Sequence, residues 1–228
     1  MKTLTILVPF FNEEKTLEKC LLELTEQTFS NEVILINDGS KDKSFNIAQK
    51  FANNFNKFKL ISLDSNQGKG AALEFSKQLI NSDYVIIYDA DLEYHLSDIP
   101  FLLDKAEMNT LVLGSRFIGS QPKKIIYRRT YIANKFLSKF FSIIHLKKIT
   151  DIATCYKLMS SKFFKSTSFK ENGFSIEVEL ISKFLKQSRN IIEIPISYHG
   201  RSYKDGKKIK TLDGFKYIYC ILKYRFIN

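Results

Sequence analysis

Short runs of aliphatic and β-branched residues alternate with amphipathic segments through the first half of the chain. The runs cover residues 4–9, 33–36, 58–63 and 84–87, and apolar residues recur at helical spacing between them. This alternation predicts an α/β fold with a mostly parallel, Rossmann-like central sheet, because parallel neighbours need crossover helices. The crossovers are expected to be right-handed and the sheet doubly wound, with helices on both of its faces. The chain has 228 residues, which suits a single domain.

Polar residues directly follow three of these runs. Asn12 and Glu13 come after the first run, Asp38 after the second, and Asp89 and Asp91 after the last. The carboxyl ends of parallel strands meet at one edge of a sheet, where open α/β sheets bind their ligands. Two neighbouring carboxylates suit Mg²⁺ or Mn²⁺, which are usually shared with substrate phosphates. A lone Asp-x-Asp is more often a solvated turn, but three polar clusters on one edge favour a binding site.

A glycine-rich turn, Gly68-Lys69-Gly70, opens the helix predicted from residue 69 to about residue 80. Backbone amides at such a helix start, with a lysine beside them, favour phosphate. The turn has neither the spacing of a P-loop nor a Gly-x-Gly-x-x-Gly fingerprint. We therefore expect Lys69 to lie near a phosphate group.

The charge of the chain is +11 overall and is divided unevenly along the sequence. Residues 1–107 hold 11 Lys or Arg against 17 Asp or Glu, whereas residues 108–150 hold nine basic residues and no acidic one. An acidic first half and a basic second half predict two kinds of ligand, with the basic half facing an anionic one. Lys123, Lys124, Arg128 and Arg129 are expected in one basic loop.

Two amphipathic helices are predicted in the basic half, over residues 132–145 and 211–226. In the first helix we expect His145 and Ser138 on the polar, exposed half. Two interpretations stay open: an ordinary helix packed on the core, and an interfacial helix in a membrane headgroup region. The apolar half of the first helix holds Ile132, Phe136, Leu137, Phe140, Phe141, Ile143 and Ile144.

The three cysteines, Cys20, Cys155 and Cys220, are scattered and odd in number, which indicates reduced thiols in an intracellular setting. No apolar stretch approaches the ~18–20 residues that cross a bilayer, and Met1-Lys2-Thr3 does not begin a signal peptide. We therefore expect a chain that does not span a membrane, although it can lie on one.

Seven motifs, in order, resemble those of family 2 glycosyltransferases, in particular the dolichyl- or polyprenyl-phosphate mannosyl- and glucosyltransferases. The resemblance covers nearly the whole chain. The motifs are Val8-Pro9-Phe10-Phe11-Asn12-Glu13-Glu14, Asn37-Asp38-Gly39-Ser40-Lys41-Asp42, Asn66-Gln67-Gly68-Lys69-Gly70, Asp89-Ala90-Asp91-Leu92, Gly114-Ser115-Arg116-Phe117, Asp151-Ile152-Ala153-Thr154-Cys155-Tyr156-Lys157 and Glu193-Ile194-Pro195-Ile196-Ser197-Tyr198-His199-Gly200-Arg201.

The resemblance implies a GT-A fold that binds a nucleotide sugar and a divalent cation. Residues 1–228 would form one domain, with 1–115 binding the donor and 116–228 facing the acceptor and the membrane. Asp89 and Asp91 would bind the cation and diphosphate, with Glu93 as a further metal ligand. The other donor contacts that it implies are Pro9, Asn12, Glu13, Asp38 and Lys69.

On the acceptor side, the resemblance implies that arginines bind a phosphate. Arg116 and Arg201 are the catalytic candidates there, together with Asp89 and Asp91 on the donor side. Either Arg128 or Arg129 would add a contact to the same phosphate. Glu177 and Glu179 are further acceptor-side candidates, and residues 201–210 resemble a segment that closes over both substrates.

The implied activity is inverting transfer of a hexose, mannose or glucose, from a GDP- or UDP-sugar to a dolichyl or undecaprenyl phosphate at the cytoplasmic membrane face. The alternative is transfer to a saccharide hydroxyl in cell-surface polysaccharide synthesis, which needs a carboxylate base. Nucleic-acid binding through the basic half is a distant alternative. The charge there shares its segment with a bulky apolar face, and no recognition motif is present.

Overall fold

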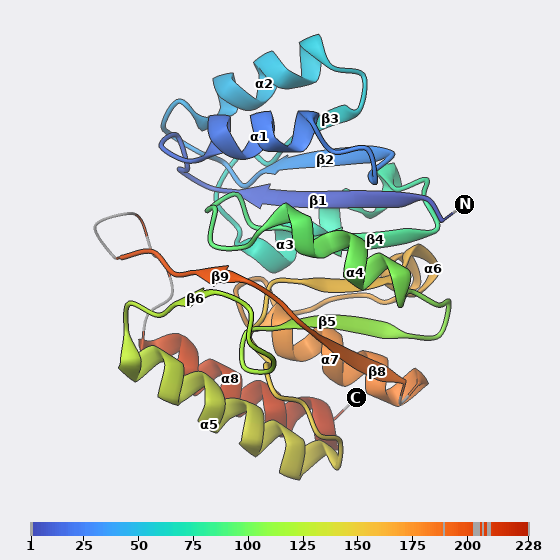
Figure 1. Ribbon diagram of the computed structural model, residues 1–228, viewed down its shortest axis with the longest axis vertical. Helices are drawn as coiled ribbons and strands as arrows, with labels where there is room; N and C mark the ends of the chain where they lie inside the picture. The colour runs from blue at the N-terminus through green and yellow to red at the C-terminus, as the bar shows by residue number, and fades with distance from the viewer. Residues whose placement is uncertain (1, 189, 203–205, 207, 209–210, 228) are drawn as a thin grey trace.

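The computed structural model describes residues 2–188, 190–202, 206, 208 and 211–227. A seven-stranded sheet with the order β3-β2-β1-β4-β7-β5-β8 runs through the molecule (Figure 1). Beside it lies a two-stranded sheet of β6 and β9. This arrangement confirms the predicted α/β fold with a mostly parallel central sheet.

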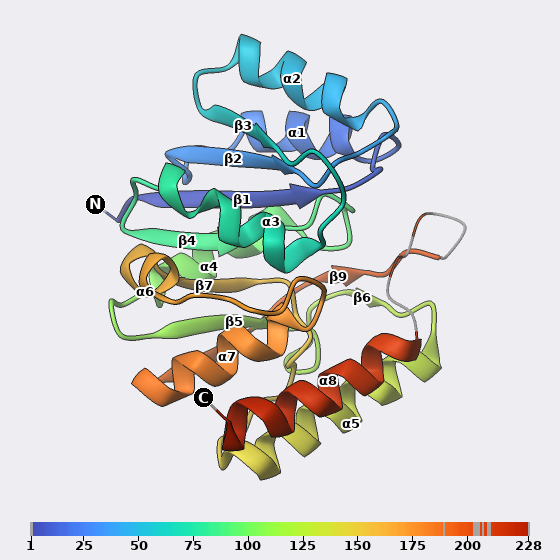
Figure 2. The ribbon, with the colours of Figure 1, turned by 180° about the vertical axis from the view of Figure 1, so that it is seen from behind.

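The acidic half forms the parallel part of the sheet, in which β1 pairs with β2 and β4, and β2 pairs with β3. These strands are almost wholly apolar because helices cover both faces of this part of the sheet. Helices α1 and α4 lie over one face, and α3, α6 and α7 over the other (Figures 1 and 2). The bounds are β1 Leu4–Phe10, α1 Leu17–Thr25, β2 Glu32–Asn37, α2 Ser44–Asn54, β3 Phe58–Ser62, α3 Lys69–Ser76, β4 Tyr84–Ile87 and α4 Ile99–Asp104.

The second half completes the sheet with a change of direction. Strand β7 is antiparallel to both of its neighbours, β4 and β5, while β5 and β8 are parallel. Strand β8 lies at the edge, as Pro195 predicts, since proline cannot donate to a central ladder. The bounds are β5 Leu111–Ser115, β6 Lys123–Lys124, β7 Lys157–Ser160, α6 Ser161–Ser166, α7 Ile176–Gln187, β8 Ile191–Pro195 and β9 Tyr198–His199.

Helices α5 (Arg128–His145) and α8 (Thr211–Phe226) lie side by side at one end of the molecule (Figures 1 and 2). Arg128 and Arg129 are therefore in the first turn of a helix, and the prediction that both belong to a loop was wrong. Within the described part of the chain, no helix combines the length and hydropathy that a membrane span needs.

The predicted exposure of His145 and Ser138 was also wrong, because both are buried. The His145 ring stacks on Phe141, and its Nε2 lies 3.1 Å from the carbonyl oxygen of Ile221 in α8. Ser138 donates to the carbonyl of Asn134 and accepts from the amide of Ile152. The face of α5 that packs on the body is thus rotated away from the most apolar side of the helix.

Candidate active site

A cavity of about 660 Å³ opens at the carboxyl edge of the sheet, beside the ends of β1, β2 and β4. Its size lies within the range usual for small-molecule sites. Ten of the residues predicted from the sequence line it, namely Pro9, Glu13, Asp38, Lys69, Asp89, Asp91, Glu93, Arg116, Glu177 and Arg201. The structure thus gathers residues from both charge halves of the chain around one space.

Asp89 and Asp91 lie in the turn after β4, where the chain leaves the sheet. Burial would raise the pKa of Asp89, but Lys69, whose Nζ is 2.8 Å from Oδ1, outweighs burial and holds that pKa below its usual value. Burial and the neighbouring carboxylates of Glu93 and Asp89 raise the pKa of Asp91 to about 7. Asp89 is therefore held as an anion. At Asp91, the positive charge of Arg201 does not offset burial and the two neighbouring carboxylates.

Lys69 is the centre of a buried chain of alternating charges. Its Nζ is 2.7 Å from Glu177 Oε1, in addition to the contact with Asp89. The second oxygen of Glu177 accepts from Lys157, which is fully buried in β7. Lys69 therefore orients the Asp89 carboxylate, and Glu177 of α7, which is itself paired with Lys157 of β7, holds Lys69.

Glu93 braces the opposite wall of the cavity. Its two carboxylate oxygens accept from the Tyr198 hydroxyl at 2.5 Å and from the Arg201 amide at 2.9 Å. Over the residues that the structure describes, no three His, Cys, Asp or Glu side chains are grouped as a metal site. Both oxygens of Glu93 are engaged in these contacts, and its role as a metal ligand stays a prediction. Asp89 and Asp91 do fit Mg²⁺ or Mn²⁺, which proteins often bind through one or two carboxylates plus substrate phosphates.

Asp38 holds the glycine-rich turn in place. Its two oxygens accept from the amides of Gln67 at 2.7 Å and Gly68 at 2.8 Å, while burial raises its pKa above the usual value. Asn12 does not line the cavity. Its side chain accepts from the Lys41 amide, so its observed role is to join the loops after β1 and β2.

Glu13 anchors the segment that follows β9. Its carboxylate pairs with both terminal nitrogens of Arg201, at 2.7 and 2.8 Å, and with Lys208 at 2.5 Å. Burial would raise the pKa of Glu13, but these cations hold it below its usual value. Arg201 also lies 3.5 Å from Asp91. The prediction that residues 201–210 form a segment closing over both substrates falls in part on residues 203–205, 207 and 209–210, which lie outside the described residues.

Arg116 belongs to a second rigid unit. Asp151, which is fully buried, accepts from Nε and Nη2 of Arg116 at 2.7 Å each and from its amide at 3.0 Å. The guanidinium carbon lies 5.9 Å from the Tyr94 ring centroid and 5.1 Å from that of Tyr198. Arg116 is thus oriented by a bidentate carboxylate and by aromatic rings, which together limit its movement.

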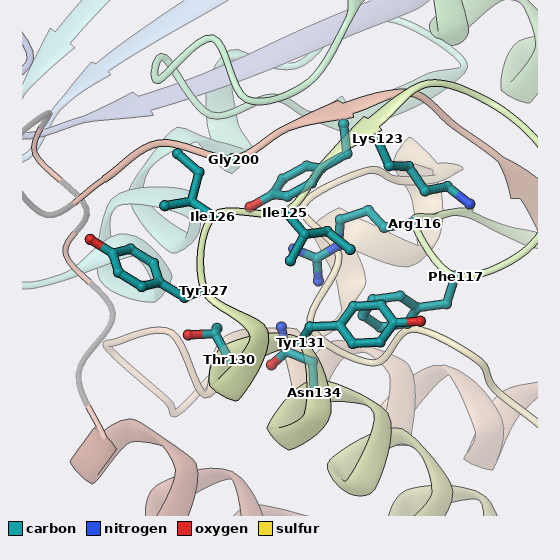
Figure 3. Close-up of a pocket in the computed structure, with 11 residues that line it drawn as sticks. Arg116, Phe117, Lys123, Ile125, Ile126, Tyr127, Thr130, Tyr131, Asn134 and Gly200 are labelled. Atoms are coloured by element: carbon teal, nitrogen blue, oxygen red, sulfur yellow. The ribbon is translucent and has the colours of Figure 1, made fainter.

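Arg116 lines a second, smaller cleft as well as the large cavity. Figure 3 shows Arg116 behind Ile125, with Phe117 and Tyr131 together below. The walls of this cleft are mainly apolar and aromatic, and they include the start of α5. Arg128 and Arg129 line neither space and are exposed. An acceptor contact through one of them stays a prediction.

Three further residues of the site come from segments far from the acidic half. Tyr217 of α8, which lines the cavity, belongs to none of the motifs. Cys155, which also lines the cavity, and Asp151, which supports it, lie in one of the seven motifs, but the sequence assigned neither residue a role. Glu177, a candidate from the sequence, lines the cavity. Glu179 does not line it; this residue accepts from the amides of Lys170 and Glu171 instead.

The fold is of the GT-A type. Glucosyl-3-phosphoglycerate synthase from Mycobacterium tuberculosis, in complex with Mn²⁺ and UDP-glucose, matches this structure with a TM-score of 0.78. The two proteins share 18% sequence identity, and the match covers 100% of this chain and 80% of that one. The comparison therefore establishes the fold.

The family model described as Glycosyl transferase family 2 matches residues 5–167. The chain belongs to this family, and it is a glycosyltransferase that uses a nucleotide-sugar donor. An uncharacterized protein of Methanocaldococcus jannaschii is 29% identical over 219 residues, which cover 89% of this chain and 93% of that protein.

Two relatives with assigned activities are similar over most of this chain. The dolichyl-phosphate beta-glucosyltransferase of Homo sapiens is 27% identical over 213 residues, covering 81% of this chain and 64% of the human protein. The undecaprenyl-phosphate 4-deoxy-4-formamido-L-arabinose transferase of Photorhabdus laumondii is 26% identical over 212 residues, covering 91% and 63% respectively. The chain spans just under two thirds of each of these two enzymes.

Proposed function

We propose that the protein transfers a hexose from a UDP- or GDP-sugar to a polyprenyl phosphate, with inversion at the anomeric carbon. One observation carries the choice of acceptor: Arg116, fixed by Asp151, lines both the large cavity and the apolar cleft. A phosphate bound to Arg116 would direct its apolar chain toward this cleft, whose walls are mainly apolar. The names of the human and Photorhabdus relatives support the same acceptor class.

The carboxylates of the cavity support an acceptor that is already ionised. Each of them has a cationic or hydrogen-bonding partner, so each is engaged in holding the site together. These residues are Glu13, Asp38, Asp89, Asp91, Glu93 and Glu177. A phosphate oxygen needs no base, whereas a saccharide hydroxyl would need one of these carboxylates to be released.

On the donor side, Asp89 and Asp91 would hold a divalent cation against the diphosphate. The cation, when bound, supplies positive charge to the departing diphosphate. Lys69 keeps Asp89 ionised and oriented for this binding. Arg201, poised between Glu13 and Asp91, is placed to meet phosphate oxygens of either substrate. Residues 1–115 thus supply the donor side, and residues 116–228 most of the acceptor side.

A transfer assay tests this function. Labelled UDP-glucose and GDP-mannose are each incubated with Mn²⁺ and either undecaprenyl phosphate, dolichyl phosphate or an oligosaccharide. We expect label in the organic phase with a polyprenyl phosphate, a loss of at least about 10²-fold in Asp91→Asn, and no loss in Asp104→Asn, an exposed aspartate on α4. Label that enters only the oligosaccharide would contradict the proposed acceptor.

A further inference from the structure

The outward sides of α5 and α8 carry matching apolar stripes. On α5, Ile132, Phe136 and Ile143 are exposed, and on α8, Phe215, Tyr219 and Phe226 are exposed. The exposed fraction of these six side chains runs from 56% to 74%. Within each helix the residues recur at intervals that keep them on one side of a 3.6-residue turn. We call these six residues the outer stripe.

Each helix also has a separate buried side, so the outer stripe is not the side that packs on the body. In α5 the buried side holds Leu137, Phe141 and His145, and in α8 it holds Tyr217, Ile221 and Tyr224. At about 100° per residue, these positions lie opposite the outer stripe on both helices. Large apolar side chains that point away from the core of a folded domain mark an interaction surface.

Basic residues surround the outer stripe. Lys135, Lys139 and Lys148 are exposed on or just after α5, and Lys216 and Arg225 are exposed on α8. Residues 108–150, which include all of α5, contain no acidic residue. Aromatic and aliphatic side chains flanked by lysines are the pattern of a helix lying in the headgroup region of an anionic membrane.

We propose that the outer stripe docks on the headgroup region of an anionic lipid bilayer, with α5 and α8 lying flat on it. The proposal rests on the function proposed above, for which it specifies the surface. The start of α5 also lines the apolar cleft at Arg116 (Figure 3), so a docked α5 would hold that cleft close to the lipid. A second copy of this chain fits less well, because two such surfaces would bring like charges together.

Vesicle flotation at low salt tests the docking. Wild-type protein should float with phosphatidylcholine vesicles that contain phosphatidylglycerol, and much less with pure phosphatidylcholine. Phe136→Ser and Phe226→Ser should each weaken partitioning about tenfold, since each removes an apolar group from the interface. The double variant Lys135→Gln/Lys139→Gln should weaken it roughly thirtyfold, at about fivefold per charge.

The matched controls are Phe101→Ser and Lys50→Gln, exposed residues of the same types on α4 and α2. Neither should change flotation. Flotation of wild type that is absent, or equally strong without anionic lipid, would overturn the docking. It would also be overturned if Phe136→Ser instead converted a dimer into a monomer in sedimentation while vesicle binding stayed unchanged.

Transfer to a short-chain, water-soluble prenyl phosphate without vesicles separates this proposal from the function it rests on. Phe136→Ser and Phe226→Ser should keep that activity, which also shows that they fold. If transfer persists while flotation fails, the docking surface alone is wrong. If flotation holds while no prenyl phosphate accepts the sugar, the proposed acceptor is wrong.

Discussion

At the scale of single residues, the pair of Arg116 and Asp151 is the clearest case of one side chain acting through another. Asp151 is fully buried, and both of its oxygens are committed to Arg116. Asp151→Asn keeps the shape but leaves the buried guanidinium without its counter-charge, which typically costs about 3 kcal/mol or more. We expect that loss in the free energy of unfolding, measured with urea, together with a rise in KM for the acceptor.

Arg116→Lys separates orientation from charge at the same position. Lysine keeps the positive charge but lacks the planar guanidinium group that donates two parallel hydrogen bonds to Asp151. Acceptor KM should therefore rise in this variant while donor KM stays near the wild-type value. Equal changes in both constants would show that Arg116 acts on the whole cavity and not on the acceptor.

The buried chain of charges from Lys157 through Glu177 and Lys69 to Asp89 predicts which substitution destabilises the protein more. Glu177→Gln leaves two buried lysines without this carboxylate, whereas Lys157→Met leaves Glu177 still paired with Lys69. We expect a loss of about 3 kcal/mol in the unfolding free energy of Glu177→Gln and a smaller loss in Lys157→Met. Urea denaturation of both variants measures the order, and the reverse order would contradict this reading of the chain.

At the scale of elements, the start of α3 is held against the turn before α7 by a glycine. The Gly70 amide donates to the Asn172 carbonyl at 2.6 Å, and a Cβ on residue 70 would lie 1.8 Å from the carbonyl oxygen of Glu171. Gly70→Ala must push these segments apart, and we expect a loss of roughly 1–3 kcal/mol in unfolding free energy.

Gly214 is the matched control for Gly70. A Cβ there meets nothing within 4 Å, and the residue lies inside α8. Gly214→Ala should stabilise the protein by about 0.5–1 kcal/mol through its higher helix propensity. A loss of stability in both variants would show that the close approach at Gly70 is not the cause.

Helix α8 is attached to the turn before α7 by Glu171, which accepts from Lys223 at 2.7 Å and Tyr224 at 2.9 Å. Burial would raise the pKa of Glu171, but these donors hold it below its usual 4.5, and the pairing raises the pKa of Lys223 above 10.5. The carboxylate contribution is therefore present above pH 4.5 and lost as pH falls through the lower, folded pKa. The lysine contribution is present below pH 10.5 and lost at higher pH.

The difference in unfolding free energy between wild type and Glu171→Gln should consequently be constant between pH 4.5 and 10.5 and shrink outside that window. Urea unfolding across a pH series measures it. Glu18→Gln, an exposed glutamate on α1, should show little difference at any pH. If the difference in unfolding free energy between wild type and Glu171→Gln grew toward low pH, the ionised pairing of Glu171 with Lys223 would be contradicted.

At the scale of the whole molecule, the parallel half of the fold could be predicted from the sequence because buried parallel strands are apolar throughout. The runs at residues 4–9, 33–36, 58–63 and 84–87 became β1 to β4 with small shifts at their ends. Their polar end residues then had to share one edge, and most of them line the cavity. In this half, the apolar pattern of the sequence and the observed strand order therefore lead to the same site.

The second half was less predictable because its partners come from distant segments. Lys157 lies fully buried in β7, where a local pattern favours an exposed position, and Glu177 of α7 balances its charge. His145 can be buried because its Nε2 lies within hydrogen-bond distance of the Ile221 carbonyl oxygen in α8. The same limit applies to the site: the sequence predicts Lys69 near a phosphate, but it does not predict the contacts of Lys69 with Asp89 and Glu177, which depend on the assembled fold.

The central claim is that the cavity beside Asp89 and Asp91 binds a nucleotide diphosphate together with a divalent cation. The most direct test is the melting temperature of wild type, Asp89→Asn, Asp91→Asn and Asp104→Asn with UDP or GDP, each with Mn²⁺ or with EDTA. One nucleotide should stabilise wild type and Asp104→Asn in Mn²⁺, by about 2.7 kcal/mol at a hundredfold excess over Kd. EDTA, or either cavity variant, should remove that stabilisation, and full retention of it in Asp89→Asn would contradict the claim.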